Sequence, residues 1–130
     1  MEKSEIAKKI MIDEDSIFTR LVEKASSVFK LDKKGNIVWM FPQDKLNDKE
    51  KISIVLLAQH LAAKIDLVEN PTISNSAIAE KLGVSSMSVG ARIAELRDQG
   101  VAQQEKVGSH QVIIHGVEKI LEKIISRIQN

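Results

Sequence analysis

The fold is decided by residues 73–101, whose sequence is ISNSAIAEKLGVSSMSVGARIAELRDQGV. Ser74 and Ser85 each precede a run with helical periodicity, where a serine hydroxyl can cap the first turn of a helix. Gly83 lies between the two runs, and glycine adopts without strain the left-handed conformation that ends a helix in a tight turn. The stretch therefore predicts two helices in close succession, at 75–82 and 86–99.

These two helices have the sequence features of a packed pair. The second carries Val89, Ile93 and Leu96 on one face, at the spacing of a helix that buries a single stripe. Ala79 in the first helix is small enough for the two helices to cross closely. Gly100 closes the second helix. We therefore expect a helix-turn-helix unit anchored in a hydrophobic core.

Two strands and a final helix follow this unit. The strands are predicted at 101–106 and 111–115, with a turn at 107–110, and the helix at 117–129. The helix carries a broad apolar stripe, which predicts either a two-fold dimer or a helix that folds back on the core. The candidate dimerisation residues are Ile120, Leu121, Ile124, Ile125 and Ile128.

Residues 48–115 as a whole resemble the winged helix-turn-helix domains of MarR-type and ArsR-type transcription regulators. In such domains the second helix of the unit enters the major groove of DNA, and the hairpin, or wing, contacts the backbone or minor groove. The resemblance implies a DNA-binding surface on helix 85–99 and wing 101–115. Its candidate residues are Ser86, Met87, Ser88, Gly90, Ala91, Arg92, Lys106 and His110.

The charge of this candidate surface leaves two functions open. The whole chain carries a formal net charge of +1, and within 72–115 lysines and arginines are balanced by aspartates and glutamates. Affinity for DNA depends strongly on neutralising phosphates, so a neutral module lacks that advantage. One hypothesis is a transcription regulator that binds duplex DNA. The alternative is a tandem winged-helix module that holds protein partners in a larger assembly.

A long helix is predicted upstream, at about 49–68, with Asn47 or Asp48 as its cap and Asn70-Pro71 as its end. The chain before it repeats the later unit at an offset of 72 residues. The identical pairs are Ile6/Ile78, Ala7/Ala79, Lys9/Lys81, Ser16/Ser88, Arg20/Arg92 and Glu23/Glu95. Either the fold contains two copies of one unit, or two amphipathic helices match by chance.

The predicted fold class is therefore mainly α with small β-hairpins, or α+β: tandem winged helix-turn-helix units that share the central helix. We expect a degenerate helix-turn-helix with a short hairpin (1–41), a winged helix-turn-helix (42–116) and a C-terminal helix (117–130). Glu14 and Asp15 open the second helix of the first unit, where they complement the helix dipole and would repel phosphate. That unit is thus expected to read no bases.

All the aromatic residues lie in the first 41 positions: Phe18, Phe29, Trp39 and Phe41. A shortened first unit has an incomplete core, and aromatic side chains bury a large apolar area. We expect these residues to dock the first unit on the central helix. This interpretation predicts that Trp39 is substantially buried.

The remaining features indicate a protein without cofactors. There is no cysteine, and His60, His110 and His115 are scattered, so no thiolate or clustered metal site is predicted. No phosphate-binding loop or nucleophile motif is present, and an enzyme is not expected. The longest apolar run, 54–58, is far too short to cross a bilayer, and the polar start does not resemble a signal peptide. We expect a cytoplasmic protein.

Overall fold

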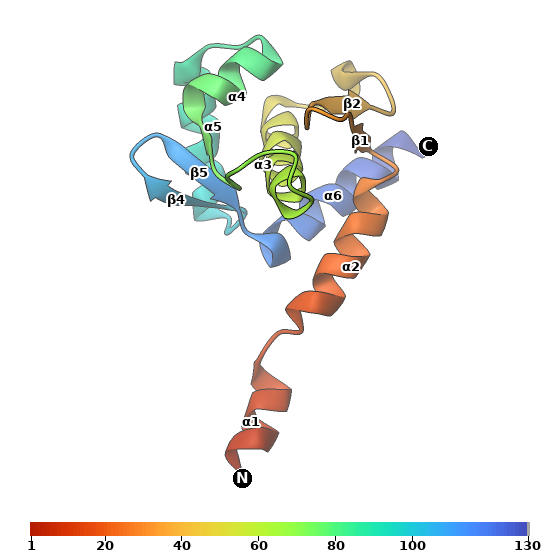
Figure 1. Ribbon diagram of the computed structural model, residues 1–130, viewed down its shortest axis with the longest axis vertical. Coiled ribbons are helices and arrows are strands. Elements are labelled where there is room, and N and C mark those ends of the chain that lie inside the picture. The colour runs from red at the N-terminus through yellow and green to blue at the C-terminus, as the bar shows by residue number, and fades with distance from the viewer. Residues whose placement is uncertain (130) are drawn as a thin grey trace.

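The computed structural model describes residues 1–129 (Figure 1). Its helices are α1 (Lys3–Ile10), α2 (Glu14–Ala25), η1 (Gln43–Lys45, a 3-10 helix), α3 (Asp48–Lys64), α4 (Asn75–Leu82), α5 (Ser86–Asp98) and α6 (Ile114–Ile128). Its strands are β1 (Phe29–Leu31), β2 (Ile37–Trp39), β3 (Ile73–Ser74), β4 (Ala102–Lys106) and β5 (Ser109–Val112). The architecture is α+β, as the sequence predicts.

The helix-turn-helix forms as its capping residues predict. The Ser74 hydroxyl accepts a hydrogen bond from the Ala77 backbone N–H at 3.1 Å, and that of Ser85 accepts one from the Ser88 N–H at 3.1 Å. Gly83 ends α4 in the left-handed conformation, with φ of 69°. The two serine caps and the glycine turn therefore fix where α4 stops and α5 begins.

A three-stranded antiparallel sheet completes the winged helix. Its strand order is β3-β5-β4, so the short strand that precedes α4 pairs with the wing. The sequence did not predict β3, because only Ile73 and Ser74 form it. Helices α3, α4 and α5 together with this sheet have the arrangement of a winged helix (Figure 1).

Helix α3 runs through the centre of the molecule. Asn47 and Glu50 form a capping box at its start, in which each side chain bonds the other residue's backbone N–H. The helix ends at Lys64, earlier than predicted, because Asp66 adopts a left-handed φ of 64° and the Leu67 N–H turns back to the Ala62 carbonyl. The middle of α3 is buried almost all round, as expected of a central helix.

One hydrophobic core includes residues of α2, α3, α4, α5 and α6 and of both hairpins. Helix α2 packs along α6, and an ion-pair cluster spans the two helices. In this cluster, the Glu118 carboxylate accepts hydrogen bonds from Arg20 at 3.2 Å and from Lys24 at 3.0 Å. The N-terminal segment is thus attached to the winged helix through α6 as well as through α3.

The aromatic residues help to attach this segment. Phe29 is buried, and Trp39, opposite it in the β1–β2 hairpin, is half-buried and packs against the core. The Phe18 ring contacts His60 of α3 edge-on, with 6.2 Å between ring centroids. The hairpin and the docking on α3 agree with the prediction, although Trp39 keeps part of its surface in water.

A second helix-turn-helix unit at the N-terminus is not confirmed. Helix α1 buries no residue and projects away from the body, beyond the start of α2 (Figure 1). By contrast, α4 buries Ile78 and Ala79 against α5 and the core. Equal spacing of apolar residues gives both segments helical periodicity, but it does not make α1 and α2 pack as a pair.

The wing differs from the prediction at both ends of β5. Its turn is formed by Val107 and Gly108, so Ser109 and His110 belong to the strand. His115 lies in α6 instead of a strand, because α6 starts at Ile114. Gly116 permits this early start: a Cβ there would overlap the carbonyl group of Gly100.

The apolar stripe of α6 lies largely within the chain. Leu121 and Ile124 are completely buried, and the other three residues of the stripe are partly buried against the same core. Helix α6 packs on both α2 and α3. This is the fold-back arrangement considered for the stripe. In addition, no helix within residues 1–129 is long and apolar enough to span a membrane.

Candidate nucleic-acid interface

The candidate interface is the outer face of α5 together with the wing. Val89, Ile93 and Leu96 point into the core, as predicted, and fix the orientation of the helix. The opposite side of α5 therefore faces solvent over its N-terminal turns. The wing extends beside α5 as an antiparallel hairpin (Figure 1).

The first turns of α5 present small and flexible side chains. Ser86, Met87 and Ala91 are exposed, with Met87 at 85%, whereas Ser88 and Gly90 are only partly exposed. A Cβ at Gly90 would lie 3.7 Å from the Asn75 Nδ2 atom, an ordinary contact. The surface therefore consists mostly of small side chains, and Met87 is its most exposed large side chain.

Positive charge on this surface is partly neutralised. Arg92 forms an ion pair with Glu95 one turn later, at 3.2 Å, and Glu95 also lies 3.7 Å from the Lys49 ammonium. Lys106 is exposed on the wing and forms no salt bridge within residues 1–129. The three-residue spacing of Arg92 and Glu95 on a helix is the sequence signal for their pairing. The approach of Lys49 was not predicted.

His110 was wrongly predicted as a wing contact to DNA. The residue is 3% exposed, because its place in β5 turns the ring inward, opposite Gln104 of β4 and Ile73 of β3. Neither ring nitrogen has a hydrogen-bond partner. Burial, reinforced by the charge of Arg97, lowers the pKa of His110 and favours its neutral form.

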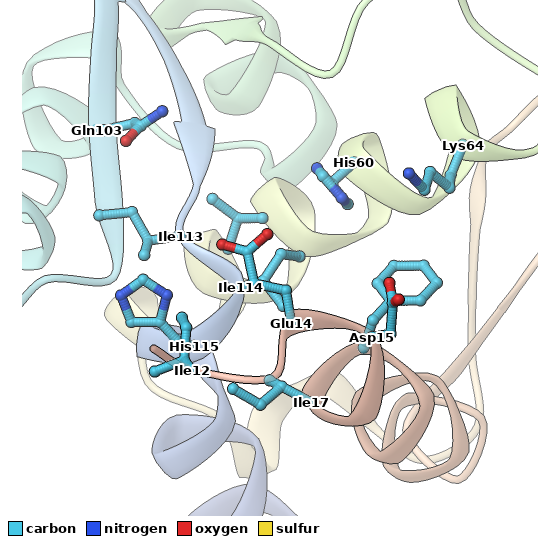
Figure 2. A pocket seen from close by; sticks show the side chains of 12 residues that line it. Ile12, Glu14, Asp15, Ile17, His60, Lys64, Gln103, Ile113, Ile114 and His115 are labelled. Carbon is cyan, nitrogen blue, oxygen red and sulfur yellow. The ribbon is translucent and has the colours of Figure 1, made fainter. Parts of the chain in front are cut away.

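A pocket of about 340 Å³ opens elsewhere, between the start of α2, the second half of α3 and the β5–α6 junction (Figure 2). His60 and Lys64 border it from α3, and Glu14 and Asp15 from α2. Burial and the neighbouring Lys64 lower the pKa of His60. No residue of α5 lines this pocket, and within residues 1–129 no three metal-binding side chains converge.

The geometry defines a winged helix-turn-helix module: two capped helices, a glycine turn and a wing that pairs with the strand before the first helix. Residues 67–103 match the family model described as winged helix-turn-helix DNA-binding. The matched segment runs from the loop after α3 to the first two residues of β4. Comparisons with curated proteins and with solved structures gave no match.

Proposed function

We propose that this protein is a transcription regulator that binds duplex DNA through α5 and the wing. The observation that carries the proposal is the exposed N-terminal half of α5 in a segment that matches a DNA-binding family model. In domains of this kind the equivalent helix lies in the major groove. An enzymatic role forms no part of the proposal.

Five exposed or partly exposed side chains of α5 can make contacts with DNA. The hydroxyl groups of Ser86 and Ser88 can donate hydrogen bonds to phosphate oxygens. Met87 and Ala91 can make apolar contacts with the methyl group of thymine. Arg92 can bind guanine or phosphate once its bond to Glu95 is exchanged. In the wing, Lys106 can neutralise a phosphate.

The near-neutral surface sets the expected strength of binding. Two candidate cations, Arg92 and Lys106, limit the number of phosphates that this face can neutralise. Each neutralised phosphate contributes about 0.9 to the slope of log affinity against log salt concentration. We therefore expect non-specific binding to be weak and observable mainly at low salt, with specificity arising from contacts in the groove.

Fluorescence anisotropy with a mixed-sequence duplex at about 50 mM salt tests the proposal, since phosphate contacts are strong at low salt. We expect the double variant Arg92→Ala/Lys106→Ala to bind more weakly and to lower the salt slope by up to about 2. The variant Lys119→Ala/Lys123→Ala, which removes two exposed cations from α6, is the matched control. Absence of binding by the unmodified protein at this salt concentration rejects the proposal.

A protein-binding module is the alternative, favoured by two exposed apolar side chains, one on α5 and one on the wing. Met87 is 85% exposed in α5, and Val107 at the tip of the wing is 93% exposed. Exposed apolar residues on a neutral surface suit a protein partner. The anisotropy experiment separates the two functions, because a protein-binding module would not bind the duplex.

The predicted dimer through α6 stays a separate proposal. With Leu121 and Ile124 completely buried in the core, contacts between copies would have to use Ile120, Ile125 and Ile128, which are partly buried. Because these three side chains already pack partly against the core, they expose less apolar surface for a dimer contact than the sequence pattern alone indicates.

A further inference from the structure

The most exposed apolar segment of the molecule is α1 and the short linker after it. Ile6 and Ile10 of α1 are 45% and 77% exposed, and Met11 and Ile12 of the linker are also largely in solvent. Helix α1 buries no residue and extends from the body beyond α2 (Figure 1). Its apolar side is thus without a partner within residues 1–129.

As an isolated segment, α1 has few interactions that stabilise its helical conformation. It is eight residues long, and its N-cap residue, Glu2, makes no side-chain capping bond. Isolated helices shorter than about 12–15 residues are marginal in water, and most helices in proteins are stabilised by packing of an apolar face. A helical α1 therefore requires a surface that covers Ile6 and Ile10.

We propose that this surface is α1 of a second copy of the chain, packed antiparallel about a two-fold axis. A two-fold interface places the same surface of each copy against the other. Ile6 of one copy then lies beside Ile10 of the other, and the reverse contact forms at the same time. The inference is independent of DNA binding and of the stripe on α6.

The charges of α1 fit an antiparallel arrangement. Its acidic residue Glu5 lies in the first turn, and its basic residues Lys8 and Lys9 lie in the last turn. Glu5 and Lys9 are four residues apart and therefore lie on the same flank of the apolar stripe. Two-fold antiparallel packing brings matching flanks together head to tail, so that Glu5 of each copy faces Lys9 of the other. Two-fold parallel packing would instead turn the flank with Glu5 and Lys9 to opposite sides of the interface in the two copies, so these charges would not pair.

The start of α2 supplies a second complementary contact. A hollow there is lined by the chain from Met11 to Asp15. Within residues 1–129, Glu14 and Asp15 form no salt bridge. In the antiparallel pair, the first turn of the second copy's α1 lies beside the last turn of α1 in the first copy. Lys3 of the second copy then approaches Glu14 and Asp15 of the first copy.

Sedimentation equilibrium of the full chain tests the pairing. We expect the unmodified protein to form dimers at high micromolar concentration, and Ile6→Glu/Ile10→Glu to be monomeric with an unchanged thermal unfolding midpoint of the body. Met40→Glu is the control, because Met40 is 52% exposed but lies outside α1. A monomeric unmodified protein, or a dimer that survives the double substitution, overturns the proposal.

Charge reversal tests the antiparallel geometry itself. The single variants Glu5→Lys and Lys9→Glu each place like charges opposite each other, and each should dimerise more weakly than the unmodified protein. Mixing the two variants should restore association, because every lysine then faces a glutamate across the heterodimer. A mixture that associates no better than the separate variants contradicts antiparallel packing.

Discussion

Arg127, in the last turn of α6, donates a hydrogen bond to the Glu50 carboxylate in the first turn of α3, at 2.6 Å. Glu50 also accepts from the Asn47 backbone N–H at 3.0 Å as part of the capping box. A single carboxylate thus joins the last turn of α6 to the start of the central helix, α3. The same Arg127 atom also donates to the Lys45 carbonyl.

Glu50→Gln is expected to lower the midpoint of thermal unfolding by a few degrees, and more at pH 7 than at pH 3. Burial raises the pKa of Glu50, but the bonds from Arg127 and Asn47 outweigh it and hold the pKa below its ordinary value. A lowered carboxyl pKa stabilises the fold at neutral pH, and this stability is lost as the pH falls through the folded-state pKa. Glu69→Gln, in an exposed loop, is the control. An equal effect of Glu50→Gln at both pH values would contradict this account.

Gly116→Ala is expected to destabilise the protein by roughly 1–3 kcal/mol or more, the range of overpacked sites. The added methyl group would meet the Gly100 carbonyl, a backbone group that cannot move aside as a side chain would. Gly90→Ala serves as the comparison, because a Cβ at Gly90 would make only an ordinary van der Waals contact, with the Asn75 side chain. Urea denaturation of both variants would measure the difference. Equal stability would show that α6 and the chain at Gly100 separate without cost.

The stability of the wing is expected to fall between about pH 7 and pH 5, through the protonation of His110. The pKa of His110 is lowered from 6.5 in the folded state by burial and by Arg97, so protons bind more readily to the unfolded chain. Stability is then present above the unfolded-state pKa and is lost as the pH falls toward the folded-state value.

The variant His110→Leu should retain more of its stability at pH 5, measured by chemical denaturation. It should unfold no more easily at neutral pH, because the ring nitrogens lose no hydrogen bonds. Part of the acid sensitivity should remain in this variant, since the pKa of His60 is also lowered. An unchanged pH profile in His110→Leu would exclude His110 as its source.

The Arg92–Glu95 pair predicts a variant with stronger DNA binding. Glu95→Gln removes a negative charge from the candidate interface and releases both Arg92 and Lys49. An exposed ion pair contributes about 0.2–1 kcal/mol, which corresponds to an affinity gain of up to about five-fold at low salt. Glu122→Gln, on α6, is the control for net charge. A gain of equal size in both variants would remove any specific role for Glu95.

The predictable part of the fold was the part specified by local chemistry. Ser74, Gly83 and Ser85 fixed α4, the turn and α5, since capping and left-handed conformations depend on single residues. The start of α6 was missed because its N-cap residue, Ile113, makes no side-chain bond and gives no capping signal. Its position depends on the approach of Gly116 to Gly100, which are distant in sequence.

The candidate site was predictable to the same extent. The exposed residues of α5 follow from helical periodicity once the buried stripe is known. His110 was wrong because the turn of the wing is shorter than expected, which moves the residue from the loop into β5. A shift of one or two residues in a strand decides whether a side chain faces solvent or core. The unpaired state of α1 was equally beyond sequence periodicity, because it is a property of packing.

The most direct test of the proposed function is to map the surface that contacts duplex DNA by the amide chemical shifts of the full chain. On titration at low salt, we expect shifts in the first half of α5, at residues 86–92, and at the wing tip, at residues 105–108. The start of α2, with Glu14 and Asp15, should not respond. Shifts confined to residues outside α5 and the wing, or no shifts at all, would contradict the account.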